Sequence, residues 1–224
     1  MCNYGGIYGY TGGNSLKDLI IVGGGGFGRE LLQWCKDVND IEHKWNIKGF
    51  IDDNEAALSD YDCDYGIIGT IKDWQPSEDE EFVIALGFPA VKQKVIQSLS
   101  KRGAAIVSLI HPDAHIGGFC KIGKGCIIYP DTRITVNVTI GDYVTILSQN
   151  FIGHDAVIGN YSTLFGGCAV NGHVVIGERT LLNNHASTVP SIKIGNDVNV
   201  GAGSFVVSNV RDGRHVFGNP ARKI

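Results

Sequence analysis

A glycine-rich turn and a pair of aspartates are the residues whose types and spacing most directly suggest chemistry. The motif Gly23-x-Gly25-x-x-Gly28 follows a short apolar run and precedes an amphipathic stretch. Glycines in such a turn let backbone N–H groups and the N-terminus of the next helix approach a pyrophosphate. Asp52 and Asp53 follow the next apolar run, where a carboxylate can accept hydrogen bonds from a ribose hydroxyl or a base. The pattern predicts a nucleotide site, although the glycines could also form only a tight turn.

Histidines are the second group that could do chemistry. The chain has 7 of them, and imidazole is the side chain best suited to accept a proton near neutral pH. Residue type alone does not select one, because a single histidine on a surface is usually an ordinary surface residue. No Cys-x-x-Cys or His-x-x-x-His spacing occurs, so we expect no metal site.

The elements around the glycine-rich turn indicate an α/β unit with a parallel sheet, because short apolar runs alternate with amphipathic stretches. Strands are expected at residues 19–22, 47–51, 82–86 and 104–109, and helices at residues 29–38 and 91–101. This unit, residues 18–109, has only about 90 residues, too few for both halves of a dinucleotide fold. A nucleoside diphosphate therefore fits the site better than NAD.

A strict six-residue period organises the rest of the chain. Steps of six from Ile110 to Val206 land on 17 positions, and all of them except Thr188 are aliphatic. Helices repeat every 3.6 residues and strands every two, so a period of six marks a solenoid in which each unit buries one aliphatic side chain. Three units make one triangular coil, and we expect the recurring glycines to relieve strain at its corners. The sequence predicts a β-helix over residues 110–224.

The same period predicts which residues stack. Residues 18 apart lie in consecutive coils, about 4.8 Å apart along the axis. Gly172 should therefore lie over His154, where a glycine leaves space for a substrate and offers an N–H group to a developing oxyanion. His173 should lie over Asp155 and could share its carboxylate.

Composition limits the possible partners and compartments. The chain has 19 Lys and Arg against 23 Asp and Glu, a net charge of −4, with no basic run, so we expect no nucleic acid partner. No apolar stretch is as long as a membrane span, and the first residues lack a signal-like core, which predicts a cytoplasmic protein without membrane contact.

Residues 1–17, rich in Gly and Tyr, are expected to form a flexible extension. Of the 6 cysteines, Cys120, Cys126 and Cys168 occupy small inward positions and should act as small hydrophobic residues.

Five segments together resemble one protein family, the hexapeptide-repeat sugar O- and N-acetyltransferases, which include the nucleotide-linked 4-amino-sugar N-acetyltransferases of bacillosamine-type pathways and sialic acid O-acetyltransferase-like proteins. The resemblance covers residues 18–224. It is carried by residues 20–28, Gly49-Phe50-Ile51-Asp52-Asp53, Ala85-Leu86-Gly87, His154-Asp155-Ala156-Val157-Ile158-Gly159 and Gly218-Asn219-Pro220-Ala221-Arg222.

This resemblance implies a fold and an activity. The fold is a small Rossmann-like domain followed by a left-handed parallel β-helix, which assembles as a homotrimer. The activity is acetyl-CoA-dependent N-acetylation of a UDP- or dTDP-linked 4-amino-4,6-dideoxy sugar by direct transfer. O-acetylation of sialic acid or another sugar hydroxyl is the first alternative, and a non-catalytic nucleotide-sensing or structural β-helix is the second.

The resemblance also implies roles for individual residues. His154 is the general base, Asp155 raises its basicity, and His173 is the alternative base. The nucleotide sugar contacts Gly25, Gly26, Phe27, Asp52, Asp53, Gly87 and, less securely, Pro89. Acetyl-CoA contacts Thr163, Gly172, Asn184 and Ala202. Three of these positions depart from the family pattern: Thr163 replaces a histidine, Asn184 replaces an aliphatic residue, and Pro89 replaces a polar residue. Leu147 also stands where the family has an asparagine.

Overall fold

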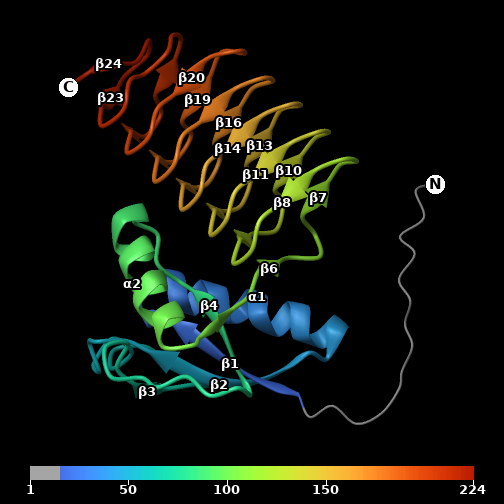
Figure 1. Cartoon of the computed structure of the whole chain (residues 1–224), viewed down its shortest axis with the longest axis vertical. Helices are drawn as coiled ribbons and strands as arrows, with labels where there is room; N and C mark the ends of the chain where they lie inside the picture. Colours follow the sequence, from blue (N-terminus) through green and yellow to red (C-terminus); the bar gives the residue numbers. More distant parts are fainter. Residues whose placement is uncertain (1–15) are drawn as a thin grey trace.

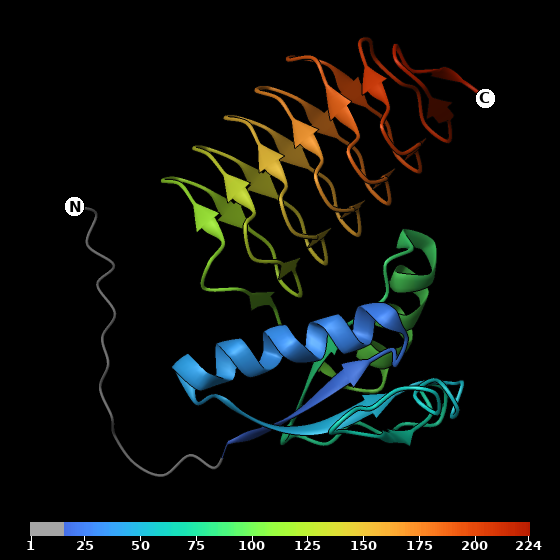
Figure 2. The ribbon, with the colours of Figure 1, turned by 180° about the vertical axis from the view of Figure 1, so that it is seen from behind.

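The computed structural model describes residues 16–224, so most of the extension expected at residues 1–17 lies outside the described residues. A small α/β unit is followed by a triangular solenoid of parallel strands (Figures 1 and 2). Both helices of the α/β unit contact the solenoid. None of the helices in residues 16–224 is long and apolar enough to cross a membrane.

The α/β unit contains a five-stranded parallel sheet in the order β3-β2-β1-β4-β5. Its strands are β1 (Lys17–Val22), β2 (Trp45–Ile51), β3 (Ile67–Gly69), β4 (Glu80–Ile84) and β5 (Ala105–Ile106), and its helices are α1 (Gly26–Glu42) and α2 (Pro89–Lys101). Alternate residues of β1 point to opposite faces of the sheet. On one face, Leu19 and Ile21 pack in the apolar cluster that includes α1. On the other face, Ile20 and Val22 pack in the cluster that includes α2. One helix therefore covers each face.

Three details differ from the sequence expectations. β3 was not expected, because a strand of only three residues gives too short a pattern to be recognised. α1 extends to Glu42, where the Asn39 side chain accepts hydrogen bonds from the backbone N–H groups of Lys44 and Trp45 and fixes the turn into β2. The strand expected at residues 104–109 is split, and its last residue belongs to β6 of the solenoid.

The solenoid has three parallel sheets joined at corners. Sheet I contains β6 (Leu109–Ile110), β9 (Ile127–Ile128), β12 (Thr145–Ile146), β15 (Thr163–Leu164), β18 (Leu181–Leu182), β21 (Asn199–Val200), β23 (His215–Phe217) and the antiparallel β24 (Arg222–Lys223). Sheet II contains β7 (His115–Ile116), β10 (Arg133–Ile134), β13 (Phe151–Ile152), β16 (Ala169–Val170), β19 (Ser187–Thr188) and β22 (Phe205–Val206). Sheet III contains β8 (Lys121–Ile122), β11 (Thr139–Ile140), β14 (Val157–Ile158), β17 (Val175–Ile176) and β20 (Lys193–Ile194).

The pairing confirms the predicted register, since every solenoid pair from β6 to β22 joins residues 18 apart. The repeat aliphatics form one continuous buried column. Thr188, the exception in the pattern, is also fully buried, and its hydroxyl accepts a hydrogen bond from the Asn171 N–H. Cys126 and Cys168 are buried in the same column, as expected.

The corner glycines have a different role from the one expected. Positive φ angles fall mainly on other residues, including Asp155 at 58° and His173 at 60°. Where a glycine directly follows the aliphatic residue of a unit, it is needed instead for the close approach of the next coil. A Cβ on Gly153 would lie 2.6 Å from the backbone nitrogen of Gly172, closer than any side chain tolerates.

Candidate active site

The glycine-rich turn leaves an open space at the N-terminus of α1. Gly25 is the N-cap of this helix, with no side-chain cap hydrogen bond and no acidic residue in the first turn. A Cβ added at Gly25 would meet no atom within 4 Å, and one at Gly26 would meet only the Arg29 guanidinium at 3.9 Å. Unopposed N–H groups at a helix N-terminus attract anions. The structure therefore provides room and partial positive charge for a phosphate at this turn.

The two aspartates hold the loops around this turn. Asp52 accepts hydrogen bonds from the backbone N–H groups of Gly24 at 2.7 Å and Asn54 at 2.8 Å, one on each carboxylate oxygen. Asp53 is exposed and accepts one from the Lys72 N–H at 3.0 Å. Each oxygen retains a second lone pair, so both side chains can still accept from a ligand. Asp52 therefore stabilises the turn through its hydrogen bond with Gly24 and also lies beside it.

The loop after β4 closes the same edge of the sheet. Gly23 has a φ of 106°, and a Cβ there would lie 2.9 Å from the Ala85 carbonyl oxygen, so the two loops touch. Gly87 packs in turn against the ring of Phe165 on the solenoid, and Pro89 is buried at the start of α2. The residues assigned to the nucleotide thus gather at the carboxyl ends of β1, β2 and β4.

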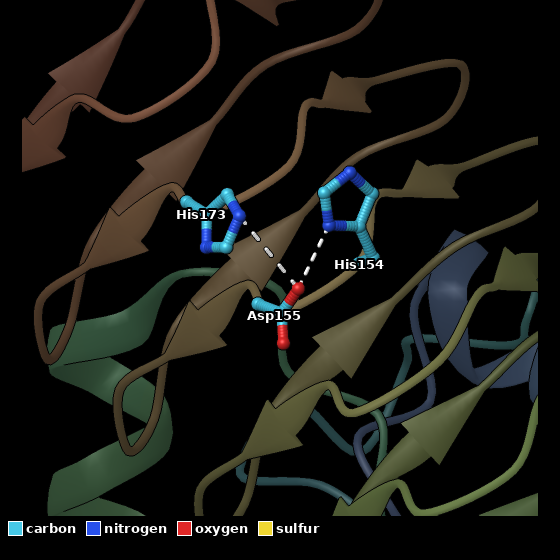
Figure 3. Close-up of side chains that lie close together, drawn as sticks. All are labelled: His154, Asp155 and His173. Atoms are coloured by element: carbon cyan, nitrogen blue, oxygen red, sulfur yellow. Dashed lines mark hydrogen bonds and ion pairs between the residues drawn. The ribbon is translucent and has the colours of Figure 1, made fainter.

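His154 and Asp155 form a hydrogen-bonded pair on the corner between sheets II and III, defined by residues 153–156, 171–174 and 189–192. The His154 Nδ1 atom lies 2.8 Å from an oxygen of Asp155, and the imidazole is 56% exposed (Figure 3). The hydrogen bond from His154, aided by the nearby charge of His173, lowers the pKa of the Asp155 carboxyl. With Nδ1–H donating to Asp155, the Nε2 atom of His154 carries the free lone pair.

Gly172 and His173 occupy the predicted positions in the next coil. A Cβ on Gly172 would lie 2.6 Å from the Nε2 atom of His154, so any larger residue at this position would displace the ring. The Nε2 atom of His173 is 3.8 Å from the same Asp155 oxygen, and the two imidazoles meet edge to face at 5.0 Å. The shorter distance makes His154 the better oriented histidine of the two.

The same cluster is a group of described residues that could hold a metal ion. One ligand atom each from His154, Asp155 and His173 lies within 4.8 Å of the others. The sequence predicted no metal site because the three residues share no local ligand motif. The solenoid brings them together from two coils, which a search for local spacing does not detect.

Two of the predicted acetyl-CoA contacts lie elsewhere. Asn184 and Ala202 are exposed in consecutive coils at the corner between sheets I and II, which comprises residues 147–150, 165–168, 183–186 and 201–204. One complete face of the solenoid, sheet II, separates this corner from His154 (Figure 1). A single chain therefore does not bring these residues to the predicted base.

Thr163 is unavailable to a ligand in this structure. Its side chain is fully buried, and its hydroxyl accepts a hydrogen bond of 2.9 Å from the ammonium group of Lys92 on α2. The same ammonium donates to the Thr145 hydroxyl at 3.0 Å and to the Ser162 carbonyl at 3.1 Å. This arrangement gives no support to the predicted contact of Thr163 with acetyl-CoA and assigns the residue to the joint between the domains.

Sequence reasoning missed three residues that shape the region between the domains: Lys92, Trp34 and Tyr129. Lys92 is 1% exposed, and its burial lowers the pKa of its ammonium group to about 7. Trp34 on α1 packs edge to face on Tyr129 of the solenoid at 5.6 Å. A lysine on a helix and single aromatics carry no local signal, because their partners lie far away in the sequence.

Comparisons with known proteins found matches to the N-terminal unit and to the whole fold. Residues 18–99 match the family model of the PglD N-terminal domain. PerB from Caulobacter crescentus, solved with CoA and GDP-perosamine, superposes with a TM-score of 0.83 at 24% identity, covering 94% of this chain and 98% of that chain. A search of curated protein sequences found no match.

Two further solved structures share the fold. The acetyltransferase domain of PglB from Neisseria gonorrhoeae FA1090, in complex with acetyl coenzyme A, gives a TM-score of 0.80 at 22% identity over 94% of this chain and all of that one (100%). WeeI from Acinetobacter baumannii AYE gives 0.75 at 26% identity over 92% of this chain and 99% of that one. The N-terminal family and the whole fold, a Rossmann-like unit followed by a left-handed β-helix, confirm the resemblance of this chain to the hexapeptide-repeat sugar acetyltransferases.

Proposed function

We propose that the protein is an acetyl-CoA-dependent N-acetyltransferase that acts on a nucleotide-linked 4-amino-4,6-dideoxy sugar. The observation that carries the proposal is the His154–Asp155 pair over Gly172, in a fold shared with proteins solved with CoA, acetyl-CoA and GDP-perosamine. The open helix N-terminus at Gly25 and Gly26 supports a nucleotide diphosphate as the carrier of the sugar.

The mechanism is direct transfer with His154 as the general base. The amine of the sugar attacks the carbonyl carbon of the thioester, and its proton passes to Nε2 of His154. Asp155 holds the Nδ1–H group and stabilises the imidazolium that forms. The tetrahedral intermediate then expels the thiolate of CoA, which takes the proton back from His154. Gly172 leaves space beside the ring for the thioester, and its N–H group is the proposed donor to the oxyanion.

A homotrimer is part of this proposal, because acetyl-CoA needs residues from two chains. The predicted donor contacts Asn184 and Ala202 lie at the corner between sheets I and II, whereas His154 lies at the corner between sheets II and III. If three solenoids pack in parallel, the corner of one chain that carries His154 can face the corner of the next chain that carries Asn184 and Ala202. The active site then lies in the groove between neighbouring chains.

The decisive experiment measures thiol release from acetyl-CoA with a panel of nucleotide sugars. The panel contains UDP-, dTDP- and GDP-linked 4-amino-4,6-dideoxyhexoses, together with free sialic acid as the O-acetylation control. We expect turnover with at least one amino sugar nucleotide and an N-acetylated product by mass spectrometry. Turnover with sialic acid alone would favour the O-acetyltransferase alternative. Absence of turnover with the whole panel, while nucleotide binding persists, would favour a nucleotide-sensing protein.

A further inference from the structure

His154, Asp155 and His173 place three metal-ligating atoms close together on the corner between sheets II and III (Figure 3). The Nδ1 atom of His154 lies 2.8 Å, and the Nε2 atom of His173 lies 3.8 Å, from the same oxygen of Asp155. In a tetrahedral zinc site with bonds of about 2.0–2.1 Å, neighbouring donor atoms are roughly 3.3 Å apart. The two measured distances lie on either side of that value, so small side-chain rotations bring all three atoms onto one ion. Within residues 16–224, no other three such side chains come this close.

The pairing of consecutive coils holds these ligands in place. Asp155 and His173 are 18 residues apart and share the left-handed backbone conformation, with φ angles of 58° and 60°. The backbone N–H group of His173 donates to the carbonyl oxygen of His154 at 2.9 Å, and that of Asp155 donates to Val136 of the preceding coil at 3.1 Å. The ligands therefore stand on a regular part of the fold, and such a preformed site loses little conformational entropy when an ion binds.

The partners of Asp155 differ from those of a comparable aspartate on the same solenoid. Asp197 forms an ion pair of 2.7 Å with the guanidinium of Arg179, which is also 18 residues away. A guanidinium stays protonated and has no lone pair, so it cannot bind a metal ion. In the described part of the chain, Asp155 forms ion pairs only with two imidazoles. Two neutral imidazoles and a carboxylate are a donor set that zinc uses, with a further position left open to water.

The tautomer of His154 determines what a bound ion does to catalysis. The proposed base donates its Nδ1–H group to Asp155 and keeps the free lone pair on Nε2. An ion on Nδ1 requires the other tautomer, in which the proton has moved through solvent from Nδ1 to Nε2. The ring then still carries one proton but has no lone pair for the amine of the substrate. Gly172 lies against the Nε2 edge of the ring, so an ion on Nδ1 does not occupy the space proposed for the thioester.

We propose that His154, Asp155 and His173 form an inhibitory zinc site, with Nδ1 of His154, one oxygen of Asp155 and Nε2 of His173 as ligands. The ion is not a cofactor, because it holds His154 in the tautomer that cannot accept a proton. Binding of the ion depends only on the three ligands, whereas the inhibition rests on the proposed function. His173 is the ligand that the proposed mechanism does not use, so its substitution separates metal binding from catalysis.

Metal binding is measured on untagged protein without substrate. Calorimetry should show one Zn²⁺ ion per chain, and Mg²⁺, which prefers oxygen ligands, should not bind. Co²⁺ serves as a spectroscopic probe and should give visible bands without the near-ultraviolet band of a cobalt thiolate, which excludes the cysteines as ligands.

Two variants remove one ligand each. His173→Asn keeps a residue that tolerates the left-handed backbone, and Asp155→Asn keeps the shape of the side chain. Each should weaken Zn²⁺ at least about tenfold, since loss of even an outer hydrogen bond to a metal ligand costs about 10- to 100-fold in affinity. His115→Ala removes an exposed histidine from β7 and is the matched control, which should bind Zn²⁺ like the wild type.

The effect on activity is followed through the N-acetylated product by mass spectrometry, because the thiolate of released CoA itself binds zinc. Zn²⁺ should lower the kcat of the wild type, leave the KM for acetyl-CoA unchanged, and lose its effect when a chelator is added. His173→Asn is compared with its own metal-free rate and should need at least about tenfold more Zn²⁺ for half inhibition. His115→Ala should be inhibited like the wild type.

The outcomes separate the metal site from the function. Equal Zn²⁺ affinity in the wild type and His173→Asn, a cobalt thiolate band, or no Zn²⁺ binding by the wild type would each overturn the site. Binding that depends on the three ligands but leaves kcat unchanged would overturn the inhibition and keep the site. If the three ligands bind Zn²⁺ and no sugar nucleotide is acetylated, the proposed function fails and the inhibition fails with it, while the metal site stands.

Discussion

At the scale of the residue, the two histidines around Asp155 are distinguished by distance. The carboxylate is 2.8 Å from His154 and 3.8 Å from His173, while both rings are more than half exposed. The pKa of the Asp155 carboxyl is lowered, so this side chain stays ionised at pH values somewhat below its usual pKa of 3.8. It stops orienting His154 only as the pH falls through the lowered pKa of the folded protein. A loss of activity well above pH 4 would therefore not report the Asp155 carboxyl.

Replacing His154 by alanine should lower kcat/KM by about 10²- to 10⁴-fold, the usual contribution of a general base. The Tm should not change, because the ring is exposed and leaves no cavity. Steady-state thiol release and thermal melting measure the two effects. His173→Ala is the matched control in the same cluster and should cost far less. A nearly fully active His154→Ala variant beside an inactive His173→Ala variant would reverse the assignment.

At the scale of the element, two glycines of the glycine-rich turn have different roles. A Cβ at Gly28 would collide with the carbonyl oxygen of Gly23, whereas a Cβ at Gly26 has open space. Gly28 is thus required for helix–strand packing and Gly26 for access to the ligand. The sequence motif predicts the turn but gives every glycine the same weight, and only the structure separates their roles.

Gly26→Val should therefore raise the KM for the sugar nucleotide at least tenfold and leave the KM for acetyl-CoA and the Tm almost unchanged. The added side chain would occupy the space where the phosphates approach the helix N-terminus. Gly28→Ala is the contrasting variant, which should lower the Tm by disturbing the turn. Equal losses of stability in both variants would show that the space at Gly26 is structural.

Lys92 makes the contact between α2 and the solenoid dependent on pH. Its burial lowers the pKa of the ammonium group to about 7, from 10.5 when exposed. Between these values the unfolded chain binds the proton and the folded chain releases it, so the Lys92 contribution raises the free energy of unfolding as the pH rises from 7 to 10.5. The full difference is on the order of 3–5 kcal/mol, because one pKa unit corresponds to about 1.36 kcal/mol.

Lys92→Met should abolish this dependence, since methionine fills similar space without a titrating group. Urea unfolding at several pH values between 6 and 10 measures the free energy of unfolding of both proteins. Relative to Lys92→Met, the wild type should gain stability as the pH rises. Lys94→Met is the control, an exposed lysine two residues further along the same helix. Parallel curves for wild type and Lys92→Met would contradict the titration of this group.

At the scale of the whole molecule, the six-residue period predicts the solenoid and its register, because each coil must bury the three aliphatic residues of its three units in the shared core. It also predicts that Gly172 lies against His154. It cannot predict how the α/β unit sits on the solenoid, since that depends on Lys92, Trp34 and Tyr129, whose partners are far away in sequence. For the same reason the burial of Thr163 emerges only from the structure.

The surface around His154 is the region where the proposed homotrimer would place a second copy of the chain. Large apolar side chains are exposed at the corner between sheets II and III and on its flanking strands: Phe119, Val136, Phe151, Val157 and Val175. Exposed apolar groups gathered in one region typically mark a protein interface. The predicted acetyl-CoA contacts Asn184 and Ala202 lie on the other side of sheet II, so a neighbouring chain that covers this region can also complete the proposed active site.

Light scattering at micromolar protein should therefore give about three times the chain mass of 24.1 kDa. Phe151→Glu places a charge in the proposed interface, and it should yield monomers that keep their circular dichroism spectrum but lose most of their activity. Ile41→Glu, at a more exposed apolar position on α1, should leave both the mass and the activity unchanged. Mixing His154→Ala with Asn184→Ala tests the shared site directly, because an interface that joins His154 of one variant to Asn184 of the other is intact and would restore some activity if the base and the donor contacts come from different chains. A fully active monomer would show that each chain contains a complete active site.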